Sequence, residues 1–212
     1  MNLTTPDPPE TMQDRRHTEK VIAAISCYSS DESEKLYGFL KISLVDINNW
    51  KEFGSGKHFQ SKITDQTGRT ALRFAKTGDL IKTNLPSWQA TGRLYDWMEI
   101  KTIEEKLYGQ TEIFFITISP AINPETDVPD PSQFMRPAGN VTLFVIRDDR
   151  KIELQVHDHS RTTGYRFFGI KDRLRHAFNI FFTGSGLHEM QWSGLLKSIL
   201  KVGIARLRVV DH

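Results

Sequence analysis

A strand–turn–strand pattern over residues 140–160 constrains the fold of this chain more than any other feature. Apart from Thr142, the side chains of 141–146 are apolar at both alternating positions, which predicts a strand buried on both faces. Five polar residues follow at 147–151, and 152–157 then alternates apolar with polar side chains. Strict alternation predicts a second strand with one face in the core. The pattern therefore predicts an antiparallel hairpin at the structural centre of the chain.

Further segments with strand character precede this hairpin. Runs at 57–64, 71–75 and 80–85 are separated by turns that contain glycine. Residues 94–103 alternate again, and nearly every residue of 112–119 is β-branched or aromatic, which predicts a central strand. Short strands at this spacing are typical of a meander or a barrel-like antiparallel sheet. We expect roughly six to eight strands, the usual size of such a sheet.

Helical periodicity is concentrated toward the two ends of the chain. Apolar residues predict a helix over about 18–28 and a second one from Asp31, where the first turn is acidic. Residues 41–47 fit a helix or a strand equally well. Two more helices are predicted over 173–182 and 190–207. The whole pattern predicts an α+β fold in which a mainly antiparallel sheet is packed by N-terminal and C-terminal helices.

The composition is that of a folded protein with little net charge. Twenty-eight lysines and arginines stand against 26 acidic residues, and 212 residues suffice to bury a core. Residues 1–17 are polar and contain three prolines, which predicts a disordered tail before a single domain at 18–212. With no signal-peptide pattern and no apolar run that spans a bilayer, we expect a cytoplasmic location without membrane partners.

Two histidines carry the one metal-site hypothesis. His157 and His159 lie two residues apart at the end of a predicted strand, so both imidazoles project from one face. Such a pair could bind a divalent metal ion and serve a metal-dependent enzyme, provided that a third ligand completes the site. No second ligand motif accompanies the pair, so solvated histidines and a protein without a cofactor are the favoured interpretation.

A second hypothesis concerns the basic and aromatic stretch at 161–176. Alternation of rings and cations is typical of surfaces that stack and track single-stranded nucleic acid. A net charge of only +2 argues against such a footprint, and nucleic-acid binding is the less favoured function. The residues that would carry it are Arg161, Tyr165, Arg166 and Lys171.

The favoured function is a non-enzymatic binding module for a protein partner or a small ligand. The glycine-rich segments lack the spacing of a phosphate-binding loop, and no nucleophile motif is present. The connection at 120–139 contains five prolines and is long enough to be a binding loop. Beside it we expect three aromatic ligand-binding residues, although one of them, Trp97, fits a core position slightly better. These residues are Trp88, Tyr95 and Trp97.

Overall fold

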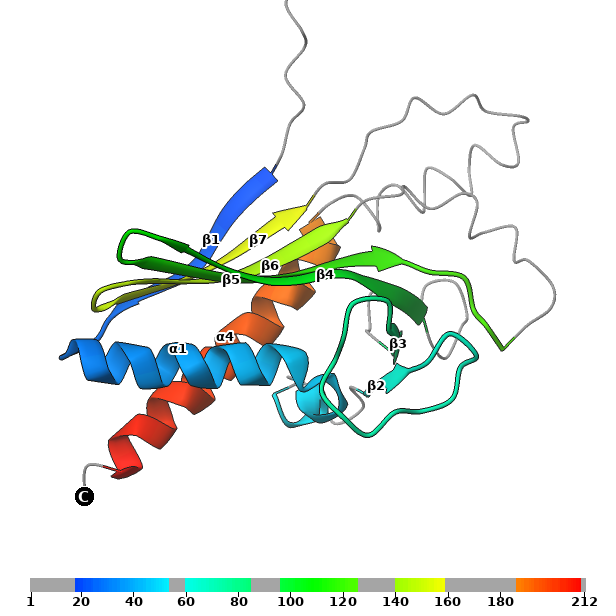
Figure 1. Cartoon of the computed structure of the whole chain (residues 1–212), viewed down its shortest axis with the longest axis horizontal. Coiled ribbons are helices and arrows are strands. Elements are labelled where there is room, and N and C mark those ends of the chain that lie inside the picture. Colours follow the sequence, from blue (N-terminus) through cyan, green and yellow to red (C-terminus); the bar gives the residue numbers. More distant parts are fainter. Residues whose placement is uncertain (1–17, 54–59, 85–95, 126–139, 159–185, 211–212) are drawn as a thin grey trace, which may run out of the picture.

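The protein folds into two layers, a curled sheet and a pair of helices on one side of it (Figure 1). A computed structural model describes residues 18–53, 60–84, 96–125, 140–158 and 186–210. The helices are α1 (Ser30–Val45), the short 3₁₀ helix η1 (Ile47–Glu52) and α4 (Gly186–Val210). The strands are β1 (Thr18–Ser26), β2 (Ser61–Thr64), β3 (Leu80–Thr83), β4 (Asp96–Tyr108), β5 (Thr111–Pro120), β6 (Val141–Asp148) and β7 (Lys151–Asp158).

The described strands form one antiparallel sheet in the order β1-β7-β6-β5-β4-β3-β2. Strands β2 to β7 follow one another as a meander, and β1 pairs with β7 at the far edge. The predicted α+β fold with its antiparallel sheet is confirmed, and so are the hairpin β6–β7 and the central position of β5. The 190–207 helix is also confirmed, as the longer α4.

The core lies between the sheet and the helices. Ile63, Ile81 and Leu143 point from the sheet toward the helices and are fully buried, as is Ile199 of α4. Full burial of such a side chain contributes about 2 kcal/mol. We call the opposite side of the sheet the outer face. Because side chains alternate along a strand, the neighbours of these inward residues project from the outer face.

The helix predicted over 18–28 is wrong, because this segment forms β1. A register shift between Val21 and Ala23 inserts one extra residue, Ile22, against β7. Such a bulge interrupts the two-residue alternation, and the spacing of Val21, Ile22 and Ile25 then resembles a helical period. Pairing along β7 outweighs this local pattern.

The strand predicted over 71–75 is also wrong. Only an isolated bridge between Thr64 and Thr70 forms, and the chain then runs irregularly to β3. The open choice at 41–47 is settled as helix, since α1 continues to Val45 and η1 begins at Ile47. The tail predicted over 1–17 and the helix predicted over 173–182 lie outside the described residues. None of the helices in the described ranges is long and apolar enough to cross a membrane.

Two glycines of α4 give a matched test of the helix packing. A Cβ on Gly203 would lie 2.7 Å from Leu36 Cδ1 and 2.8 Å from Phe39 Cδ1, whereas one on Gly194 would meet nothing within 4 Å. Gly194→Ala is expected to raise the free energy of unfolding by about 1 kcal/mol, the usual gain in a helix. In Gly203→Ala, the new methyl group would be packed too tightly against α1, and this is expected to cancel the gain in the free energy of unfolding. Urea unfolding checks both, and equal gains would contradict the close approach of α1 and α4.

Candidate ligand-binding pocket

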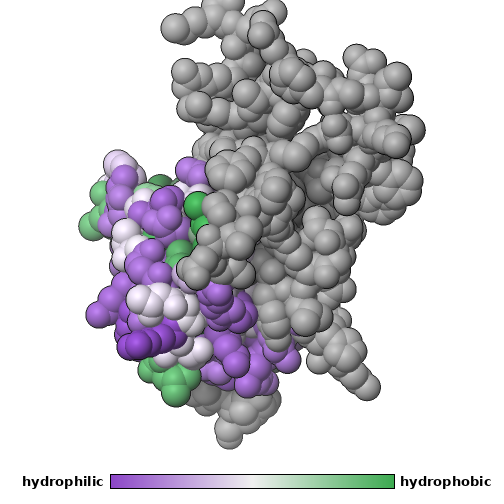
Figure 2. Space-filling model, turned by 90° about the vertical axis from the view of Figure 1, so that its right-hand side faces the viewer, coloured by the Kyte–Doolittle hydropathy of each residue, from purple (hydrophilic) through white to green (hydrophobic). Residues whose placement is uncertain are grey.

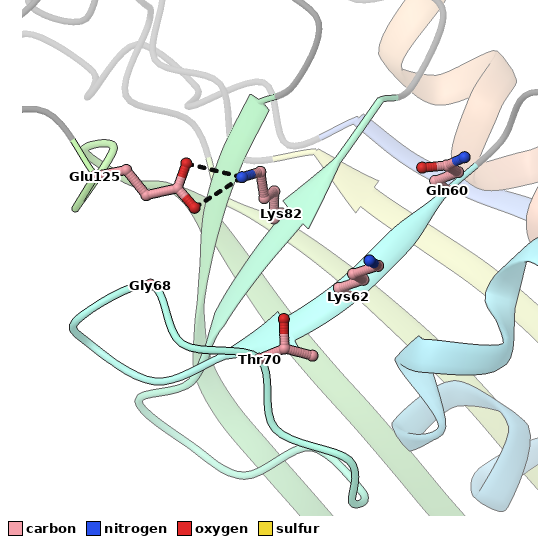
Figure 3. A pocket seen from close by; sticks show the side chains of 6 residues that line it. All are labelled: Gln60, Lys62, Gly68, Thr70, Lys82 and Glu125. Atoms are coloured by element: carbon pink, nitrogen blue, oxygen red, sulfur yellow. Dashed lines mark hydrogen bonds and ion pairs between the residues drawn. The ribbon is translucent and has the colours of Figure 1, made fainter.

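A polar pocket of about 150 Å³ lies at the β2 edge of the sheet. Figure 3 shows that its lining comes from β2, β3, the turn between them and the segment after β5. The lining residues are Gln60, Lys62, Gly68, Thr70, Lys82 and Glu125. All of them except Gly68 carry a polar or charged side chain. The pocket therefore suits a ligand that offers charge or hydrogen bonds.

Two lysines face each other across the strands that carry the pocket. Lys62 of β2 and Lys82 of β3 are register partners, next to the partners Ile63 and Ile81 that point into the core. Alternation thus places both ammonium groups on the outer face. Like charges directly opposite each other destabilise a sheet, so this pair requires a counter-charge.

Glu125 supplies a counter-charge to Lys82. The Lys82 Nζ lies 2.7 Å from each carboxylate oxygen of Glu125 (Figure 3). The same Nζ lies 5.1 Å from the centroid of the Trp97 ring, a cation–π distance. Trp97 itself is almost completely buried, so it forms a fixed base under this ammonium group. Within the described ranges, Lys62 has no carboxylate within 4 Å of its ammonium group.

The backbone around Glu125 is anchored to the sheet. The Ala121 N–H donates to the Trp97 carbonyl at 2.9 Å, and the Asn123 side chain accepts from the Glu125 N–H at 2.9 Å. Gly68 lies against Glu125 in a left-handed conformation, with φ at +84°. A Cβ there would lie 3.1 Å from the Glu125 Cγ, so glycine permits both the turn and this approach.

The turn between β2 and the 71–79 segment is organised by Asp65. Its carboxylate accepts hydrogen bonds from the Thr67 N–H, the Thr67 hydroxyl and the Arg69 N–H, at 2.6–3.0 Å. The Thr67 hydroxyl and then these amides lower the pKa of Asp65. Asp65 is thereby occupied with the turn, which holds Gly68 in place.

An unsatisfied hydroxyl lies beside the pocket. The Thr64 Oγ1 is buried, and no described residue forms a hydrogen bond with it. Thr64 lies two residues after Lys62 on β2, so both project from the outer face. It also bridges to Thr70, which lines the pocket. A buried hydroxyl without a partner is rare in proteins and marks a place where a further polar group would be stabilised.

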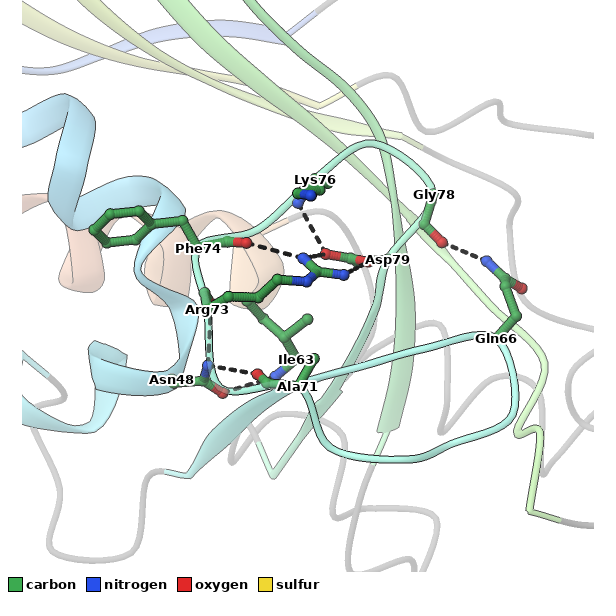
Figure 4. Close-up of polar contacts among 9 residues, drawn as sticks. All are labelled: Asn48, Ile63, Gln66, Ala71, Arg73, Phe74, Lys76, Gly78 and Asp79. Carbon is green, nitrogen blue, oxygen red and sulfur yellow. Dashed lines mark hydrogen bonds and ion pairs between the residues drawn. The ribbon is translucent and has the colours of Figure 1, made fainter.

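The segment that follows Thr70 is fixed by two polar clusters (Figure 4). The Asn48 side chain donates to the Ala71 carbonyl at 2.9 Å and accepts from the Ile63 N–H at 3.0 Å. The Arg73 guanidinium donates to both carboxylate oxygens of Asp79 at 2.6 and 2.8 Å. Hydrogen bonding to Asp79 raises the pKa of Arg73. These contacts tie one wall of the pocket to η1 and to β3.

A further polar cluster joins α1 to β4. The Tyr37 hydroxyl donates to a Glu105 carboxylate oxygen at 3.1 Å, and Lys41 forms an ion pair with the same oxygen. Burial, and then the Glu105 charge, raise the pKa of Tyr37, so the phenol stays protonated and donates. These contacts hold α1 against β4, so we assign the cluster a structural role.

The predicted site residues are only partly covered by the described ranges. Trp97 underlies Lys82, and Glu125 from the start of the 120–139 connection reaches the pocket. His157 lies on β7, with its Nε2 2.8 Å from the Gln155 Oε1 and its ring centroid 4.4 Å from that of Phe144. No group of three potential metal ligands occurs within the described ranges. Outside them lie Trp88, Tyr95, His159, Arg161, Tyr165, Arg166 and Lys171.

Comparisons with known proteins identify no family. No family model and no curated protein match the sequence. A hypothetical protein, jhp0584 from Helicobacter pylori, superposes with a TM-score of 0.44 at 8% identity, covering 95% of this chain and 99% of that chain. The structure of Ara h 8.0201 gives a TM-score of 0.38 at 11% identity, covering 90% and 98%. Similarity this low carries no argument about function.

Sequence reasoning missed the polar pocket residues Gln60, Lys62, Thr70 and Lys82. Lys62 and Lys82 are 20 positions apart in the chain, and their pairing depends on the register of β2 with β3. A signal was present in the apolar neighbours Ile63 and Ile81, which mark equivalent positions on two short strands. Residues 65–79 separate the two strands in the chain, so a local sequence pattern does not reveal that Ile63 and Ile81 are partners.

Proposed function

We propose that the protein is a non-enzymatic binding module whose ligand is a small polar molecule bound in the outer-face pocket. The observation that carries this proposal is the pairing of Lys62 with Lys82 across β2 and β3. Glu125 neutralises Lys82, whereas no carboxylate of the described residues pairs with Lys62. The side chains of Gln60 and Thr70, which also line the pocket, add hydrogen-bonding groups to the two lysines. Polar groups that converge in a concavity fix the orientation of a bound ligand and give a site its specificity.

The size and the surroundings of the pocket favour a small ligand over a protein partner. A cavity of about 150 Å³ is smaller than the usual drug-sized pocket, so it suits a compact molecule or one polar end of a larger one. Figure 2 shows that the described surface on the side where β2 and β3 lie is mainly hydrophilic, with small separate hydrophobic areas. Protein interfaces usually have a more apolar centre than this.

Ligand titrations followed by amide NMR test the proposal. The probes are inorganic phosphate, citrate and the neutral glycerol, each added to the full chain. We expect at least one probe to shift amide signals of residues 60–84 and 121–125 in a saturable way. In Lys62→Gln, affinity is expected to fall about tenfold or more, because a charge-assisted hydrogen bond contributes about 1.5–3 kcal/mol.

Lys35→Gln is the matched control for this titration. Lys35 lies on α1 and pairs with Asp31 on an exposed surface, so its loss removes the same charge away from the pocket. The affinity of this variant is expected to equal that of the wild type. The proposal fails when no probe binds, or when the two variants lose affinity to the same degree. Lysine on an edge strand also opposes strand addition, so the mass of the Lys62→Gln protein in solution is compared with that of the wild type.

A further inference from the structure

We infer that the ligand is an anion, a carboxylate or a phosphate, and that Glu125 is a built-in competitor that occupies its place on Lys82. This inference rests on the proposed binding function and specifies its chemistry. The Glu125 carboxylate makes two 2.7 Å contacts with the Lys82 Nζ, the arrangement that a carboxylate or phosphate of a ligand would adopt. The Glu125 side chain thus shows that a carboxylate group fits the position next to the Lys82 ammonium group.

The charge around the pocket favours an anion. Among the described lining residues, three are charged, namely Lys62, Lys82 and Glu125, and together they carry one net positive charge, or two once Glu125 is displaced. The wider segment 60–84 contains five basic and two acidic residues, a net charge of +3 in a chain whose net charge is +2. Its acidic residues, Asp65 and Asp79, are each engaged by several donors. The resulting local field attracts anions.

The Glu125 side chain can leave while the rest of the pocket stays in place. Its side chain is 43% exposed, and an exposed ion pair changes an equilibrium by roughly fivefold at most. The backbone of this segment is held separately, through Ala121 and Asn123. Lys82 keeps its position over the Trp97 ring, so the ammonium group remains aimed at an incoming anion.

Glu125→Gln tests the competition directly. This variant keeps the shape of the side chain and removes its charge, so anions are expected to bind up to about fivefold tighter than to the wild type. Titrations with inorganic phosphate and with citrate distinguish the two anion classes, and glycerol serves as the neutral probe. The readout is the indole N–H signal of Trp97, assigned by its loss in Trp97→Phe. Replacing Lys82 with Gln in the Glu125→Gln background is expected to abolish the gain.

Glu99→Gln is the matched control. Glu99 lies on β4, two residues from Trp97, and pairs with Lys101 away from the pocket lining. Glu99→Gln changes the net charge by the same amount as Glu125→Gln, and we expect it to change the affinity for anions less than twofold. Equal gains in the two variants, or weaker anion binding in Glu125→Gln, would overturn the inference. Saturable binding of glycerol without binding of either anion would also overturn it while leaving the proposed function intact. Absence of all binding in both proteins would overturn both proposals.

Discussion

Replacing Trp192 with alanine is expected to lower the free energy of unfolding by about 3–5 kcal/mol. Trp192 of α4 is 1% exposed and meets the Trp50 ring edge to face, at a centroid distance of 5.9 Å. This contact joins α4 to η1, and a small residue would leave a cavity between them. Chemical denaturation followed by circular dichroism measures the change.

Trp192→Phe is the informative control. The Trp192 Nε1 is buried and has no acceptor among the described residues, whereas the Trp50 Nε1 donates to the Ser43 carbonyl at 3.0 Å. Phenylalanine removes the unsatisfied donor and keeps most of the ring, so this variant is expected to cost clearly less than alanine. Trp50→Phe loses a satisfied hydrogen bond and is expected to cost more than Trp192→Phe. The reverse order would show that Trp192 donates to an acceptor after all.

The second large effect is expected at Asp79. Its side chain is 9% exposed and accepts from both Arg73 Nη atoms and from the Lys76 N–H at 2.8 Å. Asp79→Ala leaves these donors without their acceptor and is expected to destabilise the fold by about 2–3 kcal/mol. This value lies below the range for fully buried pairs because the Arg73 side chain is 38% exposed. Thermal and urea unfolding both report it.

A double-mutant cycle with Arg73→Met isolates the ion pair. The cost of the double variant is expected to be smaller than the sum of the single variants by about 1 kcal/mol or more, since the two side chains contact each other directly. Asp31→Ala is the surface control, because Asp31 and Lys35 are both largely exposed and such pairs have little measurable effect. Strict additivity at Arg73 and Asp79 would contradict the contact in Figure 4.

The elements that sequence reasoning found are those with an uninterrupted pattern. In the hairpin β6–β7, the first strand is an almost continuous apolar run and the second alternates strictly over 152–157, while β5 is β-branched or aromatic almost throughout. The missed strand β1 contains a bulge at Ile22, which replaces alternation with a spacing closer to that of a helix. The 71–75 segment has strand-like residues, yet it lacks a partner because β2 pairs with β3 instead.

The pocket was less accessible to prediction than the fold. A long proline-rich connection and nearby aromatics pointed to this region, and the structure does place Glu125 and Trp97 next to Lys82. The lysine pair itself depends on the register of two four-residue strands. Register is a tertiary property, set by which residues are buried, and no local pattern in the chain encodes it.

The alternation of side chains along β2 and β3 affects which substitutions this protein can accept. Ser61 and Ile63 point into the helix-covered core, whereas Lys62 points to the pocket, so each strand divides its residues between two unrelated tasks. Substitutions at Lys62 therefore leave the packing of Ile63 untouched, because the two side chains project from opposite faces of β2. The fold can serve as a scaffold on which ligand preference is exchanged, by evolution or by design, at little cost in foldability.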